Sequence, residues 1–147
     1  MNEFYAVWET NATTSDDLFR DIVPRLVTEG VAKSTLTDAL IAREKAFPTG
    51  LDFGYVQVAL PHADPDHVNR PGVVLVRHHT SIAFAAMGEP GTVLTVQASL
   101  WPIVVDAQAQ LDLLGNMIAL LQDEPSATTL IEGDETDALA LLSALTL

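Results

Sequence analysis

Four apolar runs in the middle of the chain limit the folds that this sequence can adopt. They are rich in valine, isoleucine, leucine and aromatic residues, and turn residues separate them, which is typical of β-strands: YVQVAL (55–60), GVVLVR (72–77), SIAFAAM (81–87) and TVLTVQASLW (92–101). The stretch VVLV within the second run is apolar on both faces of a strand. We therefore expect a central sheet that is covered from both sides.

Two helical patterns precede these strands. Residues 16–30 can be capped by Thr14 or Ser15 and ended by Gly30, and one face of this helix carries Leu18, Ile22, Arg25 and Leu26. Pro24 lies inside the pattern, so we expect a kink or an early break there.

The second pattern covers residues 34–47, with Ser34 as its cap. The apolar residues expected to point toward a core are Leu36, Ala39, Leu40 and Phe47. Pro48, Thr49 and Gly50 then stop the helix and open a loop.

The last third of the chain is predicted to be helical. After Asp106 comes an amphipathic helix with apolar residues at helical spacing: Leu111, Leu114, Ile118 and Leu121. Two shorter helices are expected near residues 125–133 and 135–145. Together these elements predict an α/β fold, a three-layer α/β/α sandwich around a small mixed β-sheet, with residues 1–147 as a single domain.

Composition excludes several kinds of function. The 147 residues include no cysteine, which rules out disulfides, thiolate zinc sites and a cysteine nucleophile. Neither a secretory signal nor an apolar run long enough to span a bilayer is present, so we expect a cytoplasmic protein without membrane insertion. A net charge of -13 argues against nucleic acid as a partner.

The few cations are unevenly placed. Of the seven lysines and arginines, four lie between positions 43 and 77, and none follows position 77: Arg43, Lys45, Arg70 and Arg77. Either this is chance in a small sample, or the segment handles an anion within an acidic protein.

The segment YVQVALPHADPDH (55–67) places His62 directly after an apolar strand and a proline. Its imidazole could bind a metal, act as a general acid or base, or carry a phosphoryl group. The spacing matches no known metal signature. For His67, His78 and His79 we adopt the simpler interpretation, solvated histidines in surface loops. A phosphoryl group on His62 would need a cation nearby, and Arg43 is a suitable bidentate partner.

Two short motifs resemble a known family. REKAFPTGL (43–51), followed by VALPHAD (58–64), is similar to the signature of the IIA components of the bacterial phosphoenolpyruvate-dependent sugar phosphotransferase system, in the fructose/mannitol class. The similarity continues through HVNRPGVVLVR (67–77) and QLDLLGNMIALLQD (110–123). The fold that this resemblance implies agrees with the α/β/α prediction.

The resemblance also implies an activity, partners and site residues. His62 would be phosphorylated by the histidine of HPr and would pass the phosphoryl group to a IIB component, with a IIC membrane permease involved only indirectly. Arg43 would orient the phosphate, Thr49 is a candidate binding residue, and neither a cofactor nor a metal is implied.

One position departs from the mannitol and fructose pattern, in which a second histidine opens the late helix. Gln110 stands there, and it can donate a hydrogen bond to phosphate but adds no charge. This departure resembles the galactitol-specific subgroup. Two other functions remain open: a regulatory IIA-like domain that binds partners according to its phosphorylation state, and a binding module without phosphoryl chemistry.

Overall fold

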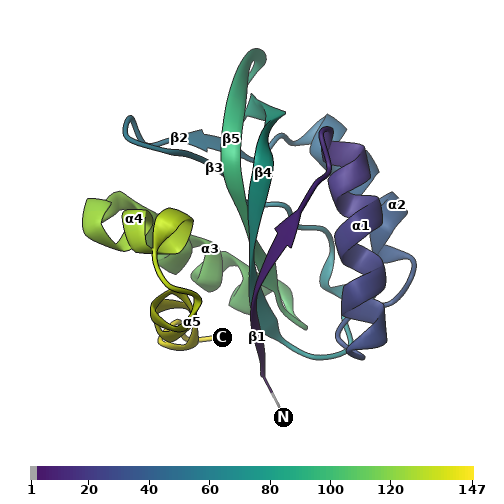
Figure 1. Cartoon of the computed structure of the whole chain (residues 1–147). Helices are drawn as coiled ribbons and strands as arrows, with labels where there is room; N and C mark the ends of the chain where they lie inside the picture. Colours follow the sequence, from purple (N-terminus) through teal and green to yellow (C-terminus); the bar gives the residue numbers. More distant parts are fainter. Residues whose placement is uncertain (1–2) are drawn as a thin grey trace.

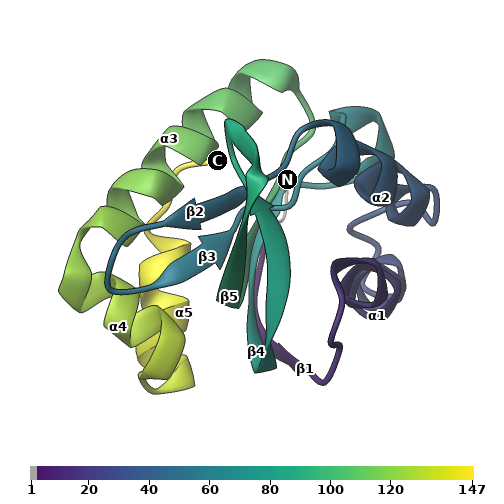
Figure 2. The same ribbon diagram turned by 90° about the horizontal axis from the view of Figure 1, so that it is seen from above.

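Alternating side chains on two long antiparallel strands create two separate cores. The strands are β4 (Gly72–Ala86) and β5 (Glu89–Ile103), and a computed structural model describes them together with the rest of residues 3–147. On β4, Val74 and Val76 pack into one core while Val73 and Leu75 pack into the other. Helices cover both faces of the sheet, α1 and α2 on one side and α3, α4 and α5 on the other (Figures 1 and 2). The predicted three-layer α/β/α sandwich is confirmed.

Helix α1 (Ser15–Thr28) begins where the sequence predicted. The Thr14 side chain accepts a 3.1 Å hydrogen bond from the Asp17 N–H, so Thr14 is the cap. The helix continues through Pro24, so the expected early break is wrong. The apolar residues of α1 are buried on both sides of the proline, and this burial outweighs the lost backbone hydrogen bond: Leu18, Phe19, Ile22, Val23 and Leu26.

Helix α2 (Leu36–Ala46) is shorter than predicted, with Thr35 rather than Ser34 at its N-cap. Leu36 and Leu40 are buried as expected, and Ala39 packs against the same core. Phe47, however, is 63% exposed, so its predicted place in the core is wrong. The backbone has already left the helical conformation at Phe47, and its side chain no longer follows the buried face.

The second helical layer consists of α3 (Ala107–Gln122), α4 (Glu124–Glu132) and α5 (Glu135–Ser143). The two short helices lie close to their predicted positions. The buried stripe of α3 is rotated from the predicted one, because Leu113, Met117 and Leu121 are buried whereas Leu111 is 67% exposed. No helix in residues 3–147 is both long and apolar enough to cross a membrane.

The N-terminal strand β1 (Phe4–Thr10) was not predicted. It pairs in parallel with β4, from Phe4 beside Gly72 to Thr10 beside His78. Residues 4–8 (FYAVW) form a short apolar run rich in aromatic residues, and their side chains alternate between the two cores, so a strand signal was present in the sequence and was missed. Gly72 permits the close approach of the two strands, since a Cβ there would lie 2.3 Å from the Phe4 carbonyl oxygen.

The other strands also differ from their predicted bounds. Runs 72–77 and 81–87 belong to one strand, β4, and a register shift between Arg77 and Ile82 absorbs the polar residues between them. A short strand β2 (Gly50–Asp52) occupies the expected loop and pairs antiparallel with β3 (Gln57–Ala59). The sheet order is β1-β4-β2-β3-β5 with β4 also paired to β5, so the predicted mixed sheet is confirmed.

Candidate functional site

The His62 ring is held by a hydrogen bond to the strand that precedes it. His62 follows β3 and the buried Pro61, and a short 3-10 helix (Pro65–His67) comes after it. Its Nδ1 lies 2.7 Å from the carbonyl oxygen of Leu60. A carbonyl oxygen can only accept a hydrogen bond, so Nδ1 carries the hydrogen and donates the bond to Leu60. The lone pair of the neutral ring is therefore on Nε2.

The surroundings of His62 favour this neutral form. Burial lowers the pKa of His62 below its ordinary value of 6.5, the hydrogen bond to Leu60 opposes that shift, and the positive charge of Arg43 lowers the pKa further. A neutral imidazole at physiological pH can act as a nucleophile or as a base through Nε2.

Arg43 comes from the last turn of α2 and has an incompletely paired guanidinium group. Its Nη1 lies 3.8 Å from a carboxylate oxygen of the exposed Asp64, at the outer limit of an ion pair. Its Cζ lies 4.9 Å from the centroid of the Phe47 ring, which orients the planar group. Within residues 3–147, the buried Nε of Arg43 has no hydrogen-bond partner. The two terminal nitrogens of the group are thus the ones that could bind an anion.

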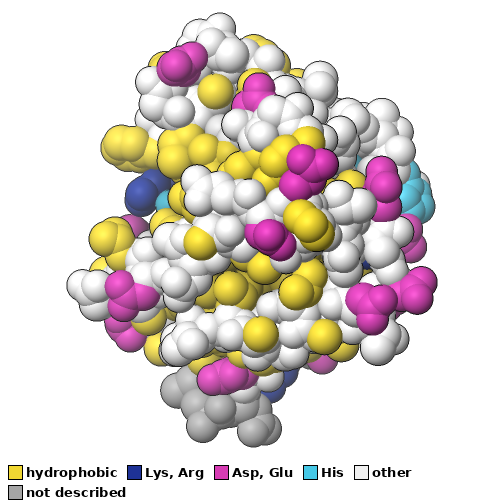
Figure 3. All heavy atoms as spheres, turned by 90° about the vertical axis from the view of Figure 1, so that its left-hand side faces the viewer, with side chains coloured by type: hydrophobic (Ala, Val, Ile, Leu, Met, Phe, Trp, Pro, Cys, Tyr) yellow, Lys and Arg dark blue, Asp and Glu magenta, His cyan; other side chains and the backbone are white. Residues whose placement is uncertain are grey.

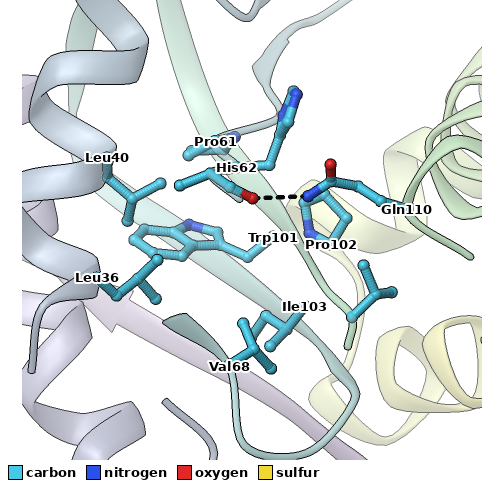
Figure 4. Close-up of a pocket in the computed structure, with 11 residues that line it drawn as sticks. Leu36, Leu40, Pro61, His62, Val68, Trp101, Pro102, Ile103 and Gln110 are labelled. Carbon is cyan, nitrogen blue, oxygen red and sulfur yellow. Dashed lines mark hydrogen bonds between the residues drawn. The ribbon is translucent and has the colours of Figure 1, made fainter. Parts of the chain in front are cut away.

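Gln110, in the first turn of α3, reaches the segment that carries His62. Its side-chain Nε2 donates a 2.8 Å hydrogen bond to the carbonyl oxygen of Ala63 (Figure 4). The amide has a second hydrogen on the same nitrogen. Gln110 thus ties α3 to the residue after His62 and retains a donor for another acceptor.

Thr49 lies behind the site. It is buried, and both its backbone N–H and its hydroxyl donate to the carboxylate of Glu44, at 2.7 and 2.8 Å. The hydroxyl is therefore already engaged in the structure. The motif analysis did not assign a role to Glu44, although its place directly after Arg43 was a signal in the sequence.

A small apolar crevice lies beneath His62. Its space amounts to about 10 Å³, roughly enough for one water molecule. Leu36, Leu40, Val68, Trp101 and Ile103 are among the residues that line it. The imidazole points away from these side chains (Figure 4). The crevice supports the His62 segment and is too small for a sugar.

The other three histidines are occupied elsewhere. His67 Nδ1 lies 2.8 Å from the Thr35 hydroxyl, and His79 contacts Asn11 and Glu9. No group of three or more histidine or acidic residues suited to a metal ion occurs in the described part of the chain.

The expectation of a surface loop is wrong for His78 and His79, which both lie within β4; His79 is exposed as expected, whereas His78 is not. His78 donates from Nδ1 to the Val96 carbonyl oxygen (3.2 Å) and accepts at Nε2 from the Ser99 hydroxyl (3.0 Å). Burial lowers its pKa to about 4, against the opposing effect of the Val96 hydrogen bond. The register of β4 and β5 brings these groups together, which no local pattern indicated.

The chain is similar to known proteins in both sequence and fold. Residues 3–144 match the family model described as "Phosphoenolpyruvate-dependent sugar phosphotransferase system, EIIA 2". The galactitol-specific EIIA component of the phosphotransferase system of Escherichia coli strain K12 is 32% identical over 111 residues, 76% of this chain and 73% of that protein.

Solved structures share the fold. The complex of enzyme IIAMTL and phosphorylated enzyme IIBMTL from Escherichia coli matches with a TM-score of 0.73 and 19% identity, over 95% of this chain and 99% of that one. The nitrogen regulatory protein IIA-Ntr from Neisseria meningitidis matches with a TM-score of 0.70 and 20% identity, over 92% and 91% of the two chains.

Proposed function

This chain belongs to the EIIA 2 family of the phosphoenolpyruvate-dependent sugar phosphotransferase system, and on that premise we propose that it is a phosphocarrier in which His62 accepts a phosphoryl group from HPr and passes it to a IIB component. The observation that carries the proposal is the hydrogen bond from Nδ1 of His62 to Leu60, which leaves the nucleophilic lone pair on Nε2. A IIC permease takes part only through IIB. Residues 1–147 act as one EIIA domain, an assignment that the match over residues 3–144 supports.

The phosphoryl transfer from one histidine to the other needs no cofactor. Nε2 of His62 attacks phosphorus, the bond from phosphorus to the donor's histidine nitrogen breaks, and its electron pair stays on the donor ring. That ring leaves neutral when its other nitrogen is protonated. His62 becomes a phosphorylated imidazolium whose Nδ1–H still faces the Leu60 carbonyl oxygen, and the new positive charge strengthens that hydrogen bond.

Arg43 and Gln110 supply the groups that receive the phosphate charge. The weakly paired Arg43 guanidinium offers two parallel N–H donors to phosphate oxygens. The second N–H of the Gln110 amide is an accessory donor from the opposite helical layer. Thr49 makes no direct bond to the phosphate in this proposal, because its hydroxyl already donates to Glu44.

A protein, rather than a small molecule, is the natural donor for this site. The crevice beneath His62 holds about 10 Å³, so a donor must approach the ring from outside. Two large apolar side chains beside site residues are exposed: Phe47, which stacks on Arg43, and Leu111, which follows Gln110. Figure 3 shows hydrophobic groups spread over the face on the α3–α5 side, with a cation and a histidine visible at its edge. Such a surface suits brief docking of a partner.

We assign a galactitol-like sugar to the pathway, because relatives with this specificity are 32% identical to the chain. Transfer assays with galactitol-specific and mannitol-specific IIB proteins as competing acceptors test this point. Faster transfer to the galactitol-specific protein is expected, and a preference for the mannitol-specific protein would contradict it.

The decisive experiment is phosphorylation by phosphoenolpyruvate, Enzyme I and HPr, followed by intact-mass analysis and peptide mapping. One phosphoryl group is expected, on His62, with a bond that acid cleaves and alkali does not. His62→Ala should remain folded and accept none. Matched controls are His67→Ala, His79→Ala and His78→Gln, the last because the partly buried His78 ring needs a replacement that both donates and accepts.

Two outcomes separate the alternatives. Phosphate on the His62→Ala protein, or none on the parent with an active donor, would contradict the phosphocarrier function. Phosphorylation of His62 without transfer to any IIB component would instead favour a regulatory IIA-like domain.

A further inference from the structure

Glu44 is a partly buried carboxylate that the proposed transfer does not use. Burial raises its pKa, while the hydrogen bonds from Thr49 act in the opposite direction. Both carboxylate oxygens are paired with this single residue, Oε2 with the Thr49 N–H and Oε1 with the Thr49 hydroxyl. Removing a carboxylate even partly from water is costly unless donors replace the water, and Thr49 supplies both donors.

A continuous series of hydrogen bonds leads from Glu44 to the ring of His62. The Thr49 carbonyl oxygen accepts from the Leu60 N–H at 3.2 Å, and the Leu60 carbonyl oxygen accepts from Nδ1 of His62 at 2.7 Å. Glu44 binds the N–H and hydroxyl of Thr49, whereas Leu60 binds the Thr49 carbonyl oxygen, so the hydrogen bonds at Thr49 belong to different peptide groups. The series therefore transmits the position of the backbone rather than charge.

The chain next to Thr49 has little freedom to move. Gly50 pairs with Ala59 on β3 and with Ala86 on β4, and its carbonyl oxygen accepts from the Met87 N–H at 2.8 Å. A Cβ on Gly50 would lie 2.7 Å from the Ala85 carbonyl oxygen. These contacts fix Thr49 relative to β3 and to the segment that leads into His62.

Glu44 is also the neighbour of Arg43 on the last turn of α2. The same helical turn therefore carries the cation beside His62 and the carboxylate that binds the backbone behind His62. Because α2 and β3 belong to different layers, the bond from Glu44 to Thr49 sets their spacing at this point. Phosphoryl transfer depends on this spacing, since a misplacement of about 1 Å can slow an enzyme about a hundredfold.

We propose that Glu44 is a positioning residue: through Thr49 and Leu60 it holds His62 in the Nδ1–H form and fixes the place of its Nε2 relative to Arg43. The expected effect on the rate of phosphoryl transfer rests on the proposed function. The expected effect on the tautomer of the unphosphorylated His62 ring does not.

The test compares Glu44→Gln with Asp38→Asn, which removes an exposed acid from the same helix. A glutamine oxygen can accept one bond from Thr49, but its NH₂ group cannot accept the other. Nitrogen-15 NMR of the His62 ring in the unphosphorylated proteins should show an Nε2–H population in Glu44→Gln and none in Asp38→Asn. Transfer from phospho-HPr should slow about tenfold in Glu44→Gln alone.

Thr49 provides a second pair of variants should Glu44→Gln fail to fold. Thr49→Val loses the hydroxyl donor and should reproduce the change in the ring, whereas Thr49→Ser keeps the donor and should restore parental behaviour. Phosphorus-31 NMR should find phosphate on Nε2 alone in the parent and partly on Nδ1 in Thr49→Val.

An unchanged His62 tautomer in both Glu44→Gln and Thr49→Val would overturn the positioning role. Failure of the parent to accept phosphate would overturn the proposed function instead, while the ring measurement would still decide the role of Glu44.

Discussion

The Arg43 guanidinium lies between an aromatic ring and a carboxylate, 4.9 Å from the Phe47 centroid to its Cζ and 3.8 Å from Asp64 to its Nη1. Neither contact uses both arms of the planar group, so a bidentate anion can replace Asp64 without disturbing the stacking on Phe47. His62 lies close enough for the Arg43 charge to lower its pKa.

Arg43→Lys should slow transfer from phospho-HPr by about 10- to 100-fold, the equivalent of one charge-assisted hydrogen bond of roughly 1.5–3 kcal/mol. Lysine keeps the charge but loses the fork. Arg43→Ala should be at least as slow, and the urea midpoint should change little in either variant. Rapid-quench measurement of phosphoprotein gives the rates, and equal rates in all three proteins would remove Arg43 from the site.

Asp64→Asn should make phosphorylation faster, by a factor of about 2 to 5, because an exposed ion pair is worth about 0.2–1 kcal/mol and its loss leaves Arg43 available to phosphate. The change also removes a negative charge near the incoming phosphoryl group. Asp66→Asn, in the 3-10 helix that follows, is the matched control. Slower transfer in Asp64→Asn would mean that Asp64 orients Arg43 rather than competing with phosphate.

The transfer rate should fall at low pH as His62 gains a proton on Nε2, with a midpoint below 6.5 because burial lowers its pKa. Removing the nearby positive charge in Arg43→Gln should raise that pKa. Proton NMR titration of the His62 ring measures the midpoint directly. A midpoint above 6.5 in the parent, or no rise in the variant, would disagree with the structure.

Gln110→Ala should slow transfer by about 2- to 10-fold, since a neutral hydrogen bond is worth about 0.5–1.5 kcal/mol. The variant also loses the bond to the Ala63 carbonyl oxygen, so the segment around His62 should exchange its amide hydrogens faster. Gln108→Ala, on an exposed face of the same helix, should match the parent. Complete loss of transfer would contradict an accessory role for Gln110.

His78 should make the protein less stable as the pH falls from about 6.5 to about 4. Its folded-state pKa of about 4 lies below the value of 6.5 for an exposed histidine, so in this range the unfolded chain binds the proton and the folded chain does not. The stabilisation is complete above pH 6.5 and amounts to about 1–3 kcal/mol. Urea unfolding across this range should show a shallower pH dependence for His78→Gln than for the parent, and parallel curves would contradict the burial of His78.

Local patterns in the sequence were sufficient for the layers of the fold. The apolar run at 73–76 required a sheet covered on both faces, and the spacing of Leu18, Ile22 and Leu26 required a helix against it; both are properties of neighbouring residues. The motifs around Arg43 and His62 likewise indicated the family. Strand β1 was missed although residues 4–8 are apolar, because the run is short and only its pairing with β4 decides that it is a strand.

The surroundings of Gln110 and His78 depended instead on contacts between distant parts of the chain. Gln110 meets Ala63 across 47 positions, and His78 meets Ser99 across the register of two strands. The sequence by itself determined which residues can carry a proton, a charge or a phosphoryl group. Tertiary structure alone decided that His78 stays neutral, because its burial and its partners arise only when β4 and β5 pair. The bonds from Thr49 to Glu44 and from His62 to Leu60 span only five and two positions, yet spacing did not reveal them, because it predicts helices and strands and not the conformation of the loops between them.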